Sequence, residues 1–256
     1  MYKLVLESRY DGTDFVGFQI QDNGRSVQGV LEEALREIYK TDIDLTGCSR
    51  TDSGVHAACH VSSADVPFFI PSEKVPLALN AVLPPDVAVK SAWYAKEDFN
   101  ARFMSLGKRY IYRIYSSPVR DPLIARYSYH TPYAPDISLM KEAASYMTGT
   151  LDYASFCAAG GSQNTTVRTV TEVNVTEDGK IPGLILIEVK GESFLYNMVR
   201  IMAGTIFYAG IGKISPEDVK MLFEMPDRKK AGKTLPACGL TLEEVYYDKE
   251  RWMVQL

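Results

Sequence analysis

The sequence has few cysteines and histidines, which limits the disulfide and metal chemistry that it supports. Its 256 residues contain four cysteines and three histidines. The cysteines are scattered and include no Cys-x-x-Cys pair, the spacing typical of zinc and redox sites. Cys48, His56, Cys59 and His60 lie close in sequence, but their spacing fits alternating strand positions better. The sequence therefore predicts no metal site, and unpaired cysteines favour the reducing cytoplasm.

Long apolar runs without polar residues are also absent. The most apolar segment, residues 194–211, contains Asn197 and Arg200, which favours a buried helix over a membrane span. Charged side chains follow residues 1–6 at once, so no signal peptide is expected. Hydrophobic residues make up 46% of the chain, enough for one large domain or two domains of ordinary size. The sequence predicts a soluble globular protein.

The net charge of −4 does not indicate a nucleic-acid partner, but the charge is unevenly distributed. Residues 100–126 contain one acid, Asp121, and six basic residues, which are Arg102, Lys108, Arg109, Arg113, Arg120 and Arg126. A second basic run contains Arg228, Lys229, Lys230 and Lys233. Local fields attract phosphates whatever the total charge, so the sequence is compatible with RNA binding. A solvated charged face is the alternative for each run.

One polar loop combines a cation, a carboxylate and a flexible glycine. A strand-like segment, residues 43–48, leads into it, and an alternating segment, residues 55–66, leads out. Arg50, Asp52 and Gly54 therefore lie in a loop between two strands, where a rigid scaffold fixes polar groups for chemistry. These residues are also good turn formers, and composition alone favours an ordinary turn.

The order of the expected elements indicates a duplicated architecture. The first half shows β-α-β-β-α-β, with a helix that Ser26 caps, at residues 2–9, 27–38, 43–48, 55–66, 72–82 and 87–94. The second half repeats this order with one extra helix, at residues 108–115, 136 or 138 to about 147, 167–176, 184–190, 194–208, 215–218 onward and 240–247. We predict an α+β protein with two ferredoxin-like (RRM-like) halves, residues 1–104 and 105–256, whose antiparallel sheets are flanked by helices. The expected catalytic cleft lies between the halves.

Eight motifs follow one another over nearly the whole chain. The most specific is Arg50-Thr51-Asp52-Ser53-Gly54-Val55-His56-Ala57. The others are Tyr10-Asp11-Gly12-Thr13 with Gly17-Phe18-Gln19, Phe99-Asn100-Ala101-Arg102-Phe103, Lys108-Arg109-Tyr110-Ile111-Tyr112, Ser155-Phe156, Arg168-Thr169-Val170, Phe194-Leu195-Tyr196-Asn197-Met198-Val199-Arg200 and Gly239-Leu240-Thr241-Leu242. Together they resemble the tRNA pseudouridine synthase I family, also called the TruA family. The sequence departs from the family at Leu235, where alanine is expected, and over residues 158–164.

The resemblance implies isomerisation of uridine to pseudouridine at positions 38, 39 and 40 in the anticodon stem-loop of tRNAs. It also implies a homodimer that uses no cofactor. Asp52 matches the family's catalytic aspartate, which acts as a nucleophile. The residues leave open whether its carboxylate attacks C1′ or C6, or removes the C2′ proton.

Two more residues have catalytic roles by resemblance. Arg200 is the partner that would keep Asp52 ionised, because a nearby positive charge lowers the pKa of a carboxyl group. Tyr110 would stack on the uracil and accept or relay the C5 proton. From the sequence alone, Arg200 also fits a surface arginine at a helix end. Tyr110 also fits an aromatic residue of the core, because Tyr112, two residues later in the same strand, lies on the same face.

The remaining assignments concern RNA. Arg50 resembles the family residue that fills the place of a uridine flipped out of its stack. Candidates for phosphate contact, which position RNA without reading its sequence, are Arg102, Lys108, Arg109, Arg113 and Arg168. His56 is expected to be a strand histidine that orders the loop rather than an acid or base.

Two other functions fit parts of the sequence, and a third, a metabolite-sensing regulatory pair, fits the expected fold and little else. A nucleoside or glycoside hydrolase would use Asp52 at an anomeric carbon, but such chemistry usually needs a second carboxylate, and none is equally placed. A non-catalytic RNA-binding module fits the basic, aromatic strand at residues 108–115 but gives no reason for Arg50-Thr51-Asp52. Release of free uracil identifies the hydrolase, because an isomerase releases none.

Overall fold

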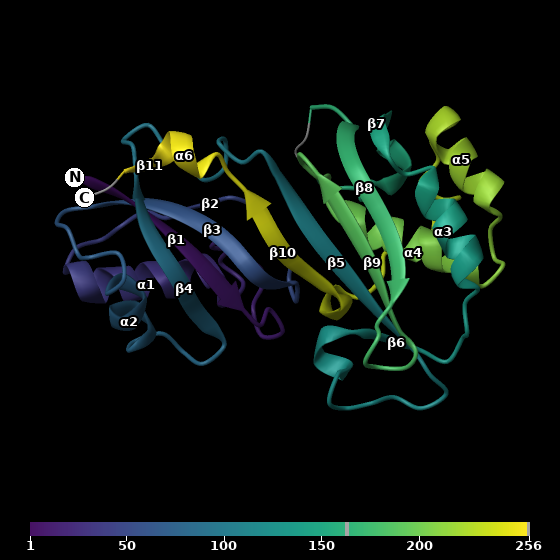
Figure 1. The fold of residues 1–256 in the computed structure, drawn as a ribbon, viewed down its shortest axis with the longest axis horizontal. Coiled ribbons are helices and arrows are strands. Elements are labelled where there is room, and N and C mark those ends of the chain that lie inside the picture. Colours follow the sequence, from purple (N-terminus) through teal and green to yellow (C-terminus); the bar gives the residue numbers. More distant parts are fainter. Residues whose placement is uncertain (162–163, 255–256) are drawn as a thin grey trace. The chain divides into compact units, whose positions relative to one another are not determined.

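The structure, a computed structural model, describes residues 1–161 and 164–254. Two residues of the 158–164 segment thus lie outside the described part of the chain. Contacts group the chain into two compact units, unit 1 with Met1–Leu106 and Leu242–Leu256, and unit 2 with Gly107–Thr241 (Figure 1). Both combine helices with sheet, which confirms the α+β class. In the described residues, no helix has the length and apolar character to cross a membrane.

Unit 1 contains an antiparallel sheet whose central strand is β1 (Tyr2–Tyr10). β1 pairs with β3 (His56–Val66) on one side and with β4 (Val87–Ala95) on the other. Two short strands, β2 (Thr46–Gly47) and β11 (Met253–Val254), extend it along β3 and β4. β10 (Leu240–Tyr246), which begins in unit 2, follows β3 in the strand order.

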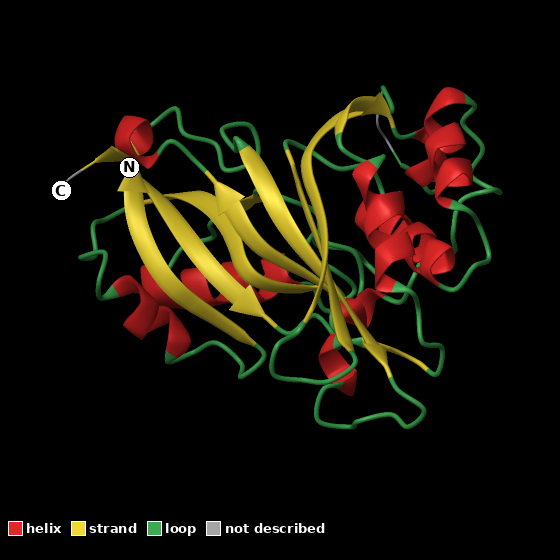
Figure 2. Cartoon of the chain, turned by 45° about the vertical axis from the view of Figure 1, so that its right-hand side comes forward, coloured by secondary structure: helices red, strands yellow, loops and turns green. Residues whose placement is uncertain are grey.

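Helices α1 (Val27–Tyr39) and α2 (Val75–Asn80) lie on one face of this sheet (Figures 1 and 2). α1 begins where predicted, because the Ser26 hydroxyl accepts a hydrogen bond from the Gly29 N–H at 3.1 Å. It ends at Lys40, which takes the left-handed conformation with φ 58°. Within its apolar stripe, Val27, Leu31 and Leu35 are completely buried.

Unit 2 contains four strands that are neighbours in the order β5-β9-β8-β7. These strands are β5 (Gly107–Ser116), β9 (Leu184–Gly191), β8 (Val167–Glu177) and β7 (Gly149–Asp152), and the short β6 (Tyr129–Thr131) pairs in parallel with β5. α3 (Ile137–Ser145) contacts β8, α4 (Met198–Gly210) contacts β5, and α5 (Pro216–Glu224) packs on α3. Short 3₁₀ turns occur at Ala125–Tyr127, Ala154–Phe156 and Ala237–Gly239.

Three expected elements are clearly shorter than predicted, and one of them is the helix at 72–82, which is reduced to α2 (Val75–Asn80). The strand expected at residues 43–48 is reduced to Thr46–Gly47, because side chains of α1 form hydrogen bonds with the backbone N–H and carbonyl of Leu45. Glu32 accepts from the Leu45 N–H at 3.0 Å, and Gln28 donates to its carbonyl at 3.1 Å. The helix expected from residue 194 begins at Met198, because Asn197 has a φ of 58° that an α-helix excludes. The short β6, β7, α6 (Lys249–Trp252) and β11 were not expected.

The C-terminal residues belong to unit 1, which differs from the expected second half, residues 105–256. Met253 pairs with Ala95 of β4, and the Trp252 ring lies 5.8 Å from that of Phe99. Lys249 Nζ forms an ion pair with Glu7 at 2.6 Å. Local sequence patterns do not show which strand a two-residue strand pairs with. The pairing of the C-terminal residues with β4 could therefore not be predicted.

The capping box of α5 provides a test of the local structure. Ser215 Oγ accepts from the Asp218 N–H at 3.0 Å, and Asp218 Oδ2 accepts from the Ser215 N–H at 3.0 Å. Ser215→Ala is expected to lower the unfolding free energy by about 1 kcal/mol, because one N–H loses its acceptor. Thermal unfolding should show a midpoint about 2–4 °C lower. Ser215→Thr keeps the hydroxyl and should have an unfolding midpoint close to that of the wild type. An unchanged midpoint for Ser215→Ala would contradict the assigned cap.

Candidate functional site

The loop that carries Arg50 and Asp52 joins β2 to β3 in unit 1, as predicted. Its first residues are held by β3, since the Cys48 N–H donates to Val61 O at 2.8 Å. His60 Nε2 donates to the Ser49 carbonyl at 2.9 Å. The loop closes in a turn in which the Val55 N–H donates to Asp52 O at 3.1 Å, followed by positive φ at Gly54. Arg50 is exposed on the same loop.

A second loop, residues 10–18, holds the Asp52 loop from the other side. The Phe18 N–H donates to Thr51 O at 3.1 Å, and the Gly54 N–H donates to Phe15 O at 3.3 Å. Ser53 Oγ also donates to Phe15 O at 3.2 Å, and the hydroxyls of Tyr10 and Thr51 are hydrogen-bonded at 2.8 Å. Gly17 and Asp52 form an antiparallel bridge. Asp52 therefore lies between two backbone anchors and has little freedom to shift.

Glycine is required where the two loops approach each other most closely. Gly17 has a φ of +124°, and a Cβ there would lie 2.7 Å from Thr51 O. A Cβ at Gly12 would lie 2.0 Å from Val55 O. The sequence analysis missed this contact, although the glycine-rich composition of residues 10–19 was a signal for close backbone approach.

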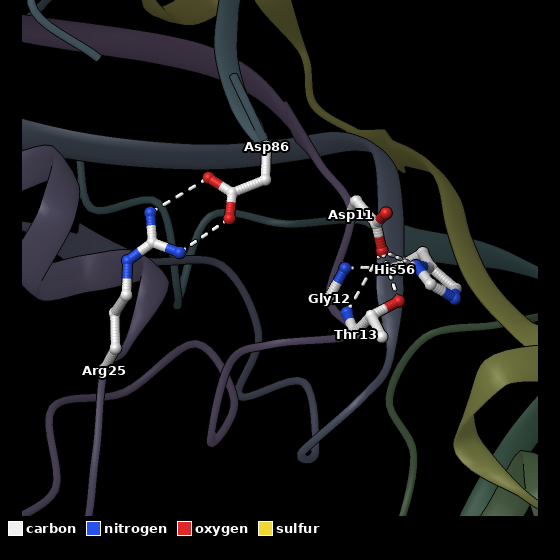
Figure 3. A network of polar contacts seen from close by, with 6 residues as sticks. All are labelled: Asp11, Gly12, Thr13, Arg25, His56 and Asp86. Atoms are coloured by element: carbon white, nitrogen blue, oxygen red, sulfur yellow. Dashed lines mark hydrogen bonds and ion pairs between the residues drawn. The ribbon is translucent and has the colours of Figure 1, made fainter. Parts of the chain in front are cut away.

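His56, the first residue of β3, connects the same two loops (Figure 3). It is 2% exposed, and its Nδ1 accepts from the Gly12 N–H at 3.0 Å. Asp11 Oδ1 lies 3.2 Å from this Nδ1 and accepts from the N–H and hydroxyl of Thr13 at 3.1 and 2.6 Å. These contacts agree with the prediction of a strand histidine that orders the loop.

Arg25 and Asp86 fix the outer side of the 10–18 loop (Figure 3). The guanidinium donates to both carboxylate oxygens of Asp86, at 2.6 and 2.9 Å, and lies 4.3 Å from the centroid of the Phe15 ring. The Asp86 carbonyl accepts from the Asp11 N–H at 3.0 Å. The hydrogen bonds from Arg25 lower the pKa of the Asp86 carboxyl group.

This lowered pKa predicts a pH-dependent contribution to stability. The folded state favours the Asp86 carboxylate, so the stabilisation is complete above the ordinary pKa of 3.8 and is lost as the pH falls through the lower folded value. Asp86→Asn should lower the unfolding free energy at pH 7 by about 1 kcal/mol or less, because Arg25 is partly solvent-exposed. In urea unfolding, the difference between wild type and variant should shrink below pH 4. A difference that stays constant down to pH 2 would contradict this account.

Tyr110 and Tyr112 lie on the same face of β5 in unit 2 but have different surroundings. The Tyr110 ring is 7% exposed and meets Phe194 edge to face, with centroids 5.2 Å apart. Tyr112 is completely buried, and its hydroxyl donates to Pro236 O at 2.7 Å. Burial raises the pKa of Tyr112 above its ordinary value. Tyr112 is thus a core residue that anchors the segment after residue 235.

Arg200 lies in the first turn of α4 and is half-buried in unit 2. Its Nε donates to Leu235 O at 2.8 Å, and one terminal nitrogen donates to Asn197 Oδ1 at 2.6 Å. The Leu235 N–H donates in turn to Arg200 O at 3.3 Å. These bonds orient the guanidinium, so Arg200 is a held side chain rather than a loose surface arginine. Leu235, which departs from the family pattern, contributes its backbone.

The candidate phosphate contacts fall into two groups. Arg102 is exposed in unit 1. In unit 2, Arg109 pairs with Glu188 at 2.8 Å, Arg113 donates to Thr241 Oγ1 at 2.9 Å, and Arg168 donates to Thr165 O at 2.9 Å. Lys108 is only 8% exposed. A buried or already paired cation must give up its present contacts before it binds a phosphate, which costs free energy. Arg50 and Arg102 are therefore the more accessible candidates.

The comparison with protein families decides the assignment. The tRNA pseudouridine synthase family model matches residues 8–104 and 143–248. The chain belongs to the tRNA pseudouridine synthase family. The resemblance inferred from the motifs is thereby confirmed, and so is the prediction of an isomerase. The ranges matched to the family include Asp52 and Arg200, whereas Tyr110 lies outside them.

Relatives of this pseudouridine synthase cover almost the whole chain. The tRNA pseudouridine synthase A of Bacillus subtilis (strain 168) is 46% identical over 250 residues, which is 96% of this chain and 99% of the relative. Those of Caldicellulosiruptor saccharolyticus and Acetivibrio thermocellus are 41% and 42% identical, over 96% of this chain and 100% and 98% of their own lengths. Among solved structures, a chain of a Cbf5-Nop10-Gar1 complex matches with a TM-score of 0.36 and 11% identity, over 96% of this chain and 51% of its own.

Proposed function

We propose that this pseudouridine synthase converts uridine to pseudouridine at positions 38, 39 and 40 of the tRNA anticodon stem-loop, with Asp52 as the nucleophile. The observation that carries the proposal is the anchoring of the Asp52 loop by hydrogen bonds from Phe18 and to Phe15. A carboxylate fixed in this way needs little reorganisation before it attacks. The name of the relatives, tRNA pseudouridine synthase A, supports tRNA as the substrate.

The reaction exchanges one bond to C1′ for another. The N1–C1′ bond breaks, the uracil turns while it is held, and C5 bonds to C1′. The C5 proton leaves to water, and N1, which has lost its bond to C1′, takes up a proton from water. Nothing is oxidised or reduced overall, so a carboxylate and a proton acceptor supply the required chemistry. The proposal therefore includes no cofactor and no metal.

Two residues of unit 2 complete the proposed machinery. Arg200 would keep Asp52 ionised, and its bonds to Leu235 and Asn197 support this role because they orient the guanidinium before substrate binds. Tyr110 would stack on the detached uracil and accept the C5 proton. Tyr112 is excluded from that role by its buried hydroxyl bond to Pro236.

The substrate must be flipped out of its stack before attack, at a cost of a few kcal/mol. Arg50 would fill the vacated place, and its exposure on the Asp52 loop supports this role. Arg102, Lys108, Arg109, Arg113 and Arg168 remain the proposed phosphate contacts.

The proposal also includes two ferredoxin-like halves in a cytoplasmic homodimer. The neighbours β4, β1, β3 and β2, with two helices on one face, support the first half. The order β5-β9-β8 with α3 and α4 supports the second.

A tritium-release assay tests the proposed reaction. An unmodified tRNA transcript with tritium at uracil C5 is incubated with the pure protein in buffer containing a metal chelator. We expect tritium to enter water without release of free uracil. Free uracil would indicate a hydrolase, and bound tRNA without tritium release would indicate a non-catalytic RNA-binding protein.

A further inference from the structure

Residues 228–235, here called the α4 strap, run along helix α4 in direct backbone contact. A Cβ at Gly232 would lie 2.4 Å from the Gly204 backbone, and a Cβ at Gly204 would lie 2.0 Å from Lys233 O. The Gly232 N–H donates to Thr205 Oγ1 at 2.9 Å. The end of the strap is fixed by the two bonds between Leu235 and Arg200. The strap is therefore a rigid element of unit 2.

Arg228 stabilises the strap from within. Its guanidinium donates to Gly232 O at 2.9 Å and to Thr234 Oγ1 at 3.0 Å, and burial lowers its pKa. Arg228 is thus occupied inside the segment, so it contributes less to a basic surface than its place in the basic run indicated. The outward cations of the strap are lysines, namely Lys229, Lys230 and Lys233.

Lys233 lies among tyrosines at the surface. Its Nζ donates to Tyr129 Oη at 3.0 Å and lies 5.0 Å from the centroid of that ring. The hydrogen bond to Tyr129, with smaller contributions from Tyr129, Tyr208 and Tyr133, raises the pKa of Lys233. Lys213 Nζ lies 4.8 Å from the centroid of the Tyr208 ring. These residues, Tyr129, Tyr133, Tyr208, Lys213 and Lys233, form what we call the Tyr–Lys patch.

The patch presents both charge and aromatic surface to solvent. Lys213 and Lys233 are exposed, and Tyr133 is 56% exposed. In the described part of the chain, neither lysine forms a salt bridge with a carboxylate. Their positive charge is therefore not neutralised by the protein and is available to an external anion.

We infer that the Tyr–Lys patch is an RNA-contact surface, in which Lys213 and Lys233 bind phosphates and Tyr133 stacks on an unpaired base or a ribose. Ammonium groups beside aromatic rings match the alternation of phosphate and base along a single strand. An acidic protein partner would also contact the lysines and tyrosines, but removal of the patch would then leave the tRNA affinity and its salt dependence unchanged. This inference rests on the proposed function for its ligand, tRNA.

The test compares two charge-matched double variants. Lys213→Gln/Lys233→Gln removes both cations of the patch, and Lys141→Gln/Lys220→Gln removes two exposed lysines from α3 and α5. tRNA affinity is measured at several KCl concentrations, together with kcat and KM. For the patch variant we expect a KM about tenfold higher, an unchanged kcat, and a slope of log affinity against log salt that is about 2 smaller in magnitude. The control variant should match the wild type.

Tyr133→Ala tests the aromatic part and should weaken tRNA binding about tenfold without changing the salt slope. The inference is overturned if the patch variant has the same affinity and salt slope as the control variant. That outcome differs from failure of the proposed function, in which the wild type itself binds tRNA and releases no tritium. Binding tests the patch whichever result the tritium assay gives.

Discussion

Replacing Asp52 by asparagine is expected to reduce kcat about ten-thousand-fold or more, because an amide does not replace a carboxylate as nucleophile. The affinity for tRNA should stay within about threefold of wild type. The described anchors of the loop use the backbone of Thr51, Asp52 and Gly54 and the side chains of Tyr10 and Ser53, and the substitution keeps all of them. Single-turnover tritium release and filter binding measure the two quantities separately.

Asp65→Asn is the matched control, because it makes the same chemical change near the other end of β3, away from the Asp52 loop and the 10–18 loop. It should keep kcat within a few-fold of wild type while it loses the ion pair to Lys3 at 2.8 Å. Turnover retained in Asp52→Asn would remove Asp52 from the mechanism. Loss of tRNA binding along with turnover would show that the substitution acts through the fold of the loop.

Replacing Gly17 by alanine should lower kcat about hundredfold, which is the second-largest effect that we expect. The new Cβ would meet Thr51 O at 2.7 Å in a backbone conformation with φ +124°, so the residues beside Asp52 must shift. A displacement of about 1 Å at a reacting group costs about a hundredfold in rate. The unfolding free energy should also fall by about 1–3 kcal/mol, because the strain remains in the folded state.

Gly183→Ala separates the effect on catalysis from the effect on stability. Gly183 also has positive φ, +78°, and its Cβ would lie 2.4 Å from Ser116 O in the hairpin of unit 2. It should lose a similar amount of stability and keep kcat near the wild-type value. If Gly17→Ala also keeps kcat, the 10–18 loop supports the fold and does not position Asp52.

The fold could be predicted where the signals are local. The Ser26 and Ser215 caps and the alternating apolar residues of β1 and β5 placed most helices and strands near their observed bounds. Prediction failed where a distant residue decides the conformation. Gln28 and Glu32 form hydrogen bonds with the backbone of Leu45, and β11 pairs with β4, which lies far away in sequence.

The candidate site shows the same division. Arg50 and Asp52 could be assigned to one loop from the strands on either side. The glycines of residues 10–19 indicate that another backbone comes close, but the Asp52 loop could not be identified as that partner, because helix α1 separates the two segments in sequence. The different surroundings of Tyr110 and Tyr112 were likewise hidden, because alternation assigns both to one face of β5. A run of basic residues in the sequence indicates more exposed charge than the structure has, because the Arg228 side chain forms hydrogen bonds within its own segment.

The most direct test of the central claim is to map pseudouridine at single-nucleotide resolution in an unmodified tRNA with uridines at positions 38, 39 and 40 and elsewhere. The transcript is treated with wild-type protein or with Asp52→Asn, labelled with a carbodiimide that marks pseudouridine, and read by reverse transcription. We predict stops that report positions 38, 39 and 40 with the wild type and none with Asp52→Asn. Stops only outside the anticodon stem-loop, or equal stops with both proteins, would contradict the account.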